Sequence, residues 1–174
     1  MNTIDVRPIL KSQYHASLAM LGEAIEFCPE NTWYDRTPRN AFWQVAYHTL
    51  FFAELYLGKS PEAYRGWSGH QANVQHPDGI PGDADPRSSL PMIADPYTPD
   101  QTLEYWRMVD SMVDSAVDAM DLASTESGFY WYKVSKLEHQ LVNIRHIQHG
   151  AAQLADRLRT ANGIGVRWVG ARVR

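Results

Sequence analysis

Histidines are the residues of this chain whose spacing is best suited to chemistry. His139, His146 and His149 fall within the segment SKLEHQLVNIRHIQHGAAQLADRLR at 135–159, and His48 falls far upstream in a run of apolar residues. Imidazole is the commonest metal ligand among side chains and also titrates near neutral pH. Several histidines on one helix therefore form a candidate reactive site.

The segment 135–159 has the pattern of one long helix. Ser135 and Glu138 are spaced as a capping box, and no proline or glycine occurs before Gly150. One arc of this helix is apolar, with Leu137, Ile144, Ile147, Ala151, Leu154 and Leu158. His139 and His146 share a different arc with Asn143 and Gln153, and His149 lies roughly 60° to one side.

Each histidine also has an ordinary structural interpretation. A single helical histidine more often forms a hydrogen bond within a fold than it binds a metal, so the metal hypothesis depends on the group. His48 shares a stripe with Ala41, Val45, Phe52 and Leu55, where an unpaired imidazole is costly to desolvate. A hydrogen bond or a metal shared with the histidine helix would meet that need equally well.

Four helices are predicted to position these histidines, over 8–27, 38–57, 99–122 and 135–160. The connection 58–97 is rich in proline and long enough to cross the helices, so the second and third helices can run parallel. His70 and His76 lie in this loop and are not assigned to the site. After Asn162 and Gly163, the tail 163–174 is predicted to be extended or strand-like.

Acidic residues line one face of the third predicted helix. Asp110, Asp114, Asp118 and Asp121 are spaced by four, four and three residues, opposite an apolar face. Hard cations use such carboxylates, but nothing else in the sequence converges on them. We therefore expect this face to be solvated.

Length and composition indicate one domain, 1–174, with no nucleic-acid or membrane partner. The chain has 174 residues and a formal net charge of −4, whereas phosphate binding usually needs a basic surface. Cys28 is the only cysteine, so no intrachain disulfide forms. The chain shows no signal peptide and no 18-residue apolar run, so a soluble cytoplasmic protein is expected.

The segments NAFWQVAYHTLFFAELYLG and LEHQLVNIRHIQHGAAQL, far apart in the chain, resemble the DinB/YfiT-like superfamily. The resemblance implies an all-α four-helix bundle of up-down-down-up topology, often dimeric, with a divalent metal such as zinc or nickel held by three histidines. It also implies that His48 and His146 are ligands. Characterised members include metal-dependent transferases and isomerases that use small thiols.

The chain departs from that family pattern at Gly150, where a ligand histidine is common. Position 150 is four residues from His146 and projects to the same side, whereas His149 is turned roughly 60° away. His149 or His139 is then the replacement, with His149 the assigned third ligand. The glycine indicates either close backbone packing or a lost ligand, and we expect the second, so that Gly150→His would strengthen metal binding.

Two functions follow as expectations. The first is a metal-dependent enzyme, a thiol S-transferase or isomerase, in which His48, His146 and His149 hold zinc or nickel and leave a position open for a small thiol. Its catalytic residues are not identifiable from the sequence. The alternative is a non-catalytic helical dimer with a degenerate metal site. The many aromatic residues favour a homodimer in either case, because large apolar patches are uncommon on monomers.

Overall fold

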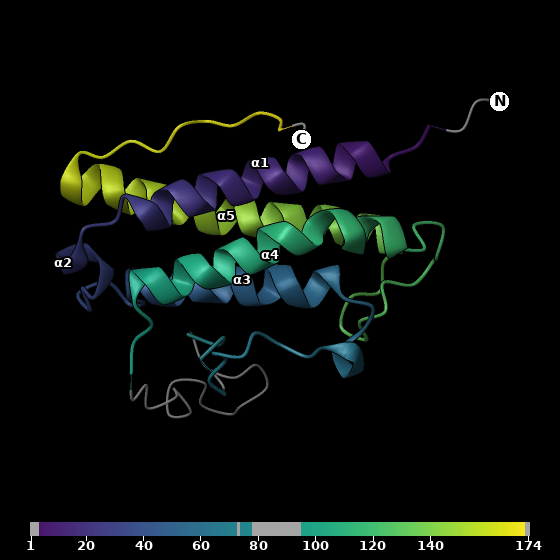
Figure 1. Ribbon diagram of the computed structural model, residues 1–174, viewed down its shortest axis with the longest axis horizontal. Helices are drawn as coiled ribbons and strands as arrows, with labels where there is room; N and C mark the ends of the chain where they lie inside the picture. Colours follow the sequence, from purple (N-terminus) through teal and green to yellow (C-terminus); the bar gives the residue numbers. More distant parts are fainter. Residues whose placement is uncertain (1–3, 73, 78–94, 173–174) are drawn as a thin grey trace.

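The computed structural model describes residues 4–72, 74–77 and 95–172. These residues form five α-helices and one short 3-10 helix, with no strand among them (Figure 1). The elements are α1 (Arg7–Glu26), α2 (Glu30–Trp33), α3 (Phe42–Leu57), η1 (Pro61–Ala63), α4 (Pro99–Ala119) and α5 (Lys136–Asn162). The all-helical class predicted from the sequence is confirmed.

The helix ends follow the capping signals in the sequence in most cases. Thr98 Oγ1 accepts from Gln101 N at 3.2 Å, and Gln101 Oε1 accepts from Thr98 N at 2.9 Å, so α4 begins with the predicted capping box. Ser135 Oγ accepts from Glu138 N at 3.2 Å at the start of α5. Gly163 ends α5 in the left-handed conformation, with φ of 69°.

Two boundaries differ from the prediction by three residues or more, and one helix was not predicted. α3 begins at Phe42 rather than at 38, because Gln44 Oε1 accepts from Ala41 N at 2.7 Å and fixes the first turn there. α4 ends at Ala119, three residues before 122. The short α2 lies in a segment that was expected to be an irregular connector, and it carries the fully buried Trp33 into the core.

The four long helices lie side by side (Figure 1). α1 and α3 each pack against both α4 and α5. The apolar stripes predicted from the sequence meet at the centre, as burial of nonpolar surface requires. The largest fully buried side chains are Trp33, Tyr14, Tyr47, Tyr105, Phe42, Leu18, Leu21, Ile25, Leu50, Ile147, Leu154 and Leu158.

Polar contacts along the seam between α3 and α5 fix the register of these two helices. Gln140 Nε2 donates to the Tyr56 carbonyl at 3.4 Å, and Asn143 Nδ2 donates to the Ala53 carbonyl at 3.1 Å. The later residue on α5, Asn143, contacts the earlier residue on α3, Ala53. The two helices are therefore antiparallel. Gln140 and Asn143 are fully buried, and sliding the helices would leave their amides unpaired at a cost of about 1–3 kcal/mol each.

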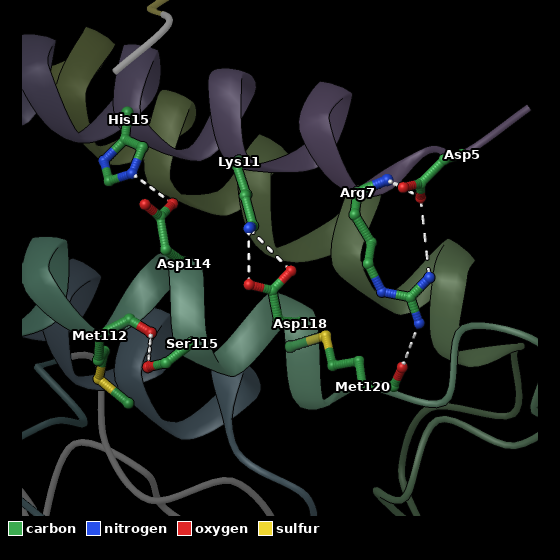
Figure 2. A network of polar contacts seen from close by, with 9 residues as sticks. All are labelled: Asp5, Arg7, Lys11, His15, Met112, Asp114, Ser115, Asp118 and Met120. Carbon is green, nitrogen blue, oxygen red and sulfur yellow. Dashed lines mark hydrogen bonds and ion pairs between the residues drawn. The ribbon is translucent and has the colours of Figure 1, made fainter.

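The expectation of a solvated acidic face on α4 is wrong for Asp110. Only 4% of Asp110 is exposed, and its Oδ1 lies 2.7 Å from Nδ1 of the buried His15 on α1. His15 Nε2 reaches Asp114 Oδ1 at 3.1 Å, and Lys11 pairs with Asp118 one turn further along (Figure 2). The acids therefore face α1, because their spacing matches that of basic side chains on the neighbouring helix.

The carboxy-terminal tail is extended, as predicted, and lies along α1 (Figure 1). Gln13 Nε2 donates to the Gly170 carbonyl at 3.1 Å, and the Arg172 amide donates to Ser12 Oγ at 3.2 Å. Arg167 pairs with Glu23 at 2.9 Å. The long connection predicted at 58–97 lies partly outside the described residues.

Within residues 4–72, 74–77 and 95–172, no helix combines the length and apolar character needed to cross a membrane.

Candidate functional site

His48 lies in the middle of α3 and is held by the loop that follows this helix. Its Nδ1 lies 2.6 Å from the main-chain carbonyl oxygen of Gln75. A carbonyl oxygen only accepts hydrogen bonds, so His48 Nδ1 carries the proton, and in the neutral ring Nε2 keeps its lone pair. The ring also packs on Phe52, one turn along α3, with centroids 4.9 Å apart. Orientation and tautomer of His48 are thus both fixed.

His146 on α5 faces His48 across the helix seam. The two Nε2 atoms are 3.2 Å apart, and the ring centroids are 5.1 Å apart. The amides of Gln140 and Asn143 that fix the α3–α5 register bring the next turn of α5 opposite His48. The prediction that these two histidines point at each other is confirmed.

The His146 ring is half-buried and is neutral near pH 7. Burial lowers its pKa to about 4, with smaller contributions from the nearby His48 and His149. Its Nδ1 is buried and has no hydrogen-bond partner among the described residues. In the absence of another ligand, His146 Nε2 donates to the lone pair of His48 Nε2. The planes of the two rings meet at 60°.

The distance between the Nε2 atoms of His48 and His146 matches that between two ligands of one metal ion. Two imidazole nitrogens at roughly 2.0–2.1 Å from a tetrahedral ion stand about 3.3 Å from each other. The observed Nε2–Nε2 distance of 3.2 Å is close to that value. His48 also has the outer hydrogen bond that metal-ligating histidines usually make, through Nδ1 to Gln75, whereas His146 Nδ1 has no such partner in the described part of the chain.

His149, the assigned third ligand, lies outside this pair. Its side chain is exposed, and its Nε2 lies 3.1 Å from Gln153 Nε2, one turn along α5. His146 and His149 both line a surface pocket of about 560 Å³, together with Val142 and Arg145. His149 therefore lies near His146 but does not contact His48.

His139, the other possible replacement ligand, is enclosed in an aromatic cluster. Its ring centroid lies 4.7 Å from that of Tyr56, 4.8 Å from Phe129 and 4.9 Å from Tyr132. Seven residues of helix separate it from His146 by about 10 Å along the axis. Burial, and then the charge of Lys136, lowers its pKa to about 4. His139 is therefore a buried neutral side chain of the core.

Gly150 is closely packed. Close backbone packing therefore explains this glycine, rather than the loss of a ligand that was expected. A Cβ at this position would stand 2.8 Å from Thr49 Cγ2 and closer still to Thr49 Oγ1. Thr49 is fixed, because its hydroxyl donates to the Val45 carbonyl at 2.7 Å. The glycine allows α5 to approach α3 directly beside the histidine pair, and this close approach explains its presence in mid-helix.

Two loop residues belong to the surroundings of the pair and were not assigned to it from the sequence. Gln75 contributes a main-chain carbonyl, which any residue type supplies, so no sequence signal could identify it. His76 packs near Phe52 with ring centroids 6.0 Å apart. Its pKa is lowered by burial and then by the charge of His48, so it lies close to the pair.

Within the described residues, no group of three or more His, Cys, Asp or Glu side chains is arranged to hold a metal ion. Comparison with protein-family models, with curated proteins and with solved structures finds no match to this chain. The likeness to DinB/YfiT-like proteins therefore stays a prediction.

Proposed function

We propose that this protein binds a divalent metal, zinc or nickel, through His48 and His146, and that it uses the ion in a thiol-dependent transfer or isomerisation. One observation carries the proposal, the 3.2 Å separation of the two Nε2 atoms from helices that meet only in the folded chain. In a fold without a metal role, a half-buried histidine pair with one unpartnered nitrogen is costly to maintain. A metal ion bound by both Nε2 atoms would not partner His146 Nδ1, but its binding free energy would offset this cost.

The residues of the pair have distinct roles in this proposal. Gln75 orients His48 by accepting its Nδ1 proton, so Nε2 of His48 is available without rearrangement. His146 stays neutral through burial and offers Nε2 once it no longer donates to His48. Phe52 covers both rings, with its centroid 5.7 Å from that of His146, and so limits water on that side. A divalent ion with an open position supplies Lewis acidity that lowers the pKa of a thiol or water bound to it.

The same proposal extends to the architecture and the family. A four-helix bundle of up-down-down-up topology is supported by the packing of α1 and α3 against both α4 and α5, and by the antiparallel register of α3 and α5. The course of the ribbon in Figure 1 agrees with it. Membership of the DinB/YfiT-like superfamily rests on the two sequence segments that carry His48 and His146.

The proposal allows two sources for the third metal ligand. His149 reaches the pair only if its bond to Gln153 Nε2 breaks and its side chain swings toward His146. A solvent molecule or the substrate thiol completes the coordination if His149 does not. His149→Ala separates these cases, because it weakens metal binding only in the first.

The activity is tested with purified protein loaded with zinc or nickel. A small thiol and an electrophilic acceptor are supplied, and loss of free thiol is followed with a disulfide reagent. The proposal predicts turnover by the metal-loaded protein and none by the metal-free protein or by His48→Gln. Metal binding without turnover across thiols and acceptors would leave a metal-binding protein and contradict the transferase.

The alternative function, a non-catalytic helical dimer with a degenerate metal site, is favoured by two observations. Gly150 is packed on Thr49 where a third ligand would lie, and His149 faces solvent. Several large apolar side chains are exposed and available for association, namely Ile4, Ile9, Phe27, Tyr130, Trp131, Leu141 and Trp168. Sedimentation at micromolar concentration tests the homodimer that both functions include, and a monomer at all concentrations would contradict it.

A further inference from the structure

Lys136, the first residue of α5, has a buried amine without a counter-ion. Only 8% of the residue is exposed, and its Nζ has no hydrogen-bond partner in the part of the chain that the structure describes. Nζ lies over the Phe129 ring, 5.4 Å from its centroid. The positive end of the α5 dipole lies at the same place and disfavours the charged amine further. A buried ammonium is normally paired, so this one lacks an expected partner.

A pocket of about 570 Å³ adjoins this amine. It lies where α3 and α4 end and α5 begins. Lys136 lines it together with the aliphatic side chains of Leu57, Ala116, Ala119 and Met120. Its volume is in the range of pockets that take small organic ligands. The pocket has a largely aliphatic wall beside the buried amine of Lys136.

Gly128 allows the main chain to pack closely on Lys59 beside the amine. Its φ of 89° is in the left-handed region, and a Cβ there would stand 3.4 Å from Lys136 Nζ and collide with the main-chain oxygen of Lys59. Any other residue would be strained and would cover the amine. The glycine thus lets the loop between α4 and α5 pass directly beside Nζ.

We propose that this pocket binds a small aliphatic monocarboxylic acid, whose carboxylate pairs with Lys136 Nζ and whose hydrocarbon chain lies on Leu57, Ala116 and Met120. The carboxylate supplies the missing partner as a charge-assisted hydrogen bond. The four-carbon stem of the lysine lets the amine turn from Phe129 toward the pocket.

The pocket suits a monocarboxylate better than a more highly charged anion. Lys59, Asp121 and Glu126 also line the pocket, and all three are exposed, so solvent screens their charges. A dianion such as phosphate would gain nothing from the aliphatic wall. A single negative charge at the buried end of a hydrocarbon chain suits both features.

Calorimetric titration with sodium hexanoate tests this, in buffer with a chelator so that the outcome is independent of any metal. Hexanamide has the same shape without the charge and serves as the matched probe. The natural chain should bind hexanoate at least roughly tenfold more tightly than hexanamide, because the charge-assisted bond is absent from the amide. Lys136→Met should abolish that difference, and Lys133→Met, at an exposed lysine, should keep it.

A second variant distinguishes loss of binding from loss of the fold. Ala116→Leu fills the pocket and leaves Lys136 in place, so it should weaken hexanoate binding while circular dichroism shows an intact fold. Lys136→Met should unfold at the same or a higher temperature than the natural chain, because it removes an unpartnered buried cation. The proposal is overturned if the natural chain does not bind hexanoate, or if Lys136→Met binds hexanoate as tightly as the natural chain.

Discussion

Gly150 on α5 lies directly against Thr49 on α3, so closely that the histidine pair His48 and His146 depends on this contact for its geometry. A Cβ at position 150 would stand 3.0 Å from Thr49 Cβ and 2.8 Å from Thr49 Cγ2. Thr49 immediately follows His48, and Gly150 lies one helical turn after His146. A larger residue at 150 would push α5 away from α3 at the site itself.

Gly150→Ala is therefore expected to destabilise the protein, although alanine favours helix over glycine by about 1 kcal/mol. Overpacking of a tight core costs roughly 1–3 kcal/mol, and the threonine cannot retreat while its hydroxyl is bonded to Val45. Urea unfolding measures the change. Thr49→Ala removes Oγ1 and Cγ2, so the double variant should be more stable than the sum of the two single changes predicts.

The same contact reverses the expectation for Gly150→His. This change alone should lower stability and leave metal affinity unimproved, because the imidazole has no room beside Thr49. Only in combination with Thr49→Gly is a gain in zinc affinity expected. A gain from Gly150→His alone in calorimetric titration would mean that α5 moves away from α3 at little cost.

His15 links α1 to α4 through two carboxylates, and we expect its loss to be destabilising. His15→Gln would remove at least one contact to the buried Asp110, where hydrogen bonds to charged groups are worth about 1.5–3 kcal/mol. The matched control is Lys11→Gln, which breaks the 2.8 Å pair with Asp118 on the same seam (Figure 2). Asp118 is 59% exposed, so this control should cost less than about 1 kcal/mol. Equal losses in urea unfolding would contradict the assignment of His15 as the main link.

Stability is expected to fall as the pH decreases from about 6.5 to about 4. The pKa values of His139 and His146 drop from 6.5 to about 4 on folding, chiefly through burial. Between these values the unfolded chain binds protons that the folded chain does not, so acid favours unfolding, by at most about 3 kcal/mol for each histidine. Their contribution is fully present above pH 6.5.

His139→Phe provides the control for this pH dependence. The phenyl ring fits the cluster of Tyr56, Phe129 and Tyr132 without a titrating group, so the slope of stability against pH should become shallower. Thermal unfolding measured in steps between pH 7 and pH 4 gives this slope. An unchanged slope would show that His139 does not resist protonation in the folded state.

Much of the helical framework is predictable from the sequence because its signals are local. The Thr98–Gln101 capping box and the terminal Gly163 mark helix ends by contacts within one turn. These helix ends need no knowledge of other elements. The facing of His48 and His146 involves two helices, and it was expected from the resemblance of the two segments that carry them to the DinB/YfiT-like superfamily.

Features that depend on two elements were not predictable in the same way. Burial of Asp110 requires His15 on another helix, and the packing of Gly150 requires Thr49 at the same level of α3. The carbonyl of Gln75 reaches His48 through a loop whose course has no periodic signal. Each was misjudged or missed because residue type alone does not specify the neighbour.

Zinc and nickel titration of metal-free protein in a calorimeter tests whether His48 and His146 share a metal ion. We expect one ion per chain, with affinity reduced by at least roughly tenfold, or about 1.4 kcal/mol, in either His48→Gln or His146→Gln. His139→Phe, on the same helix but within the aromatic cluster, should bind as the natural chain does. Absence of binding by the natural chain, or binding that survives both His48→Gln and His146→Gln, would contradict the account.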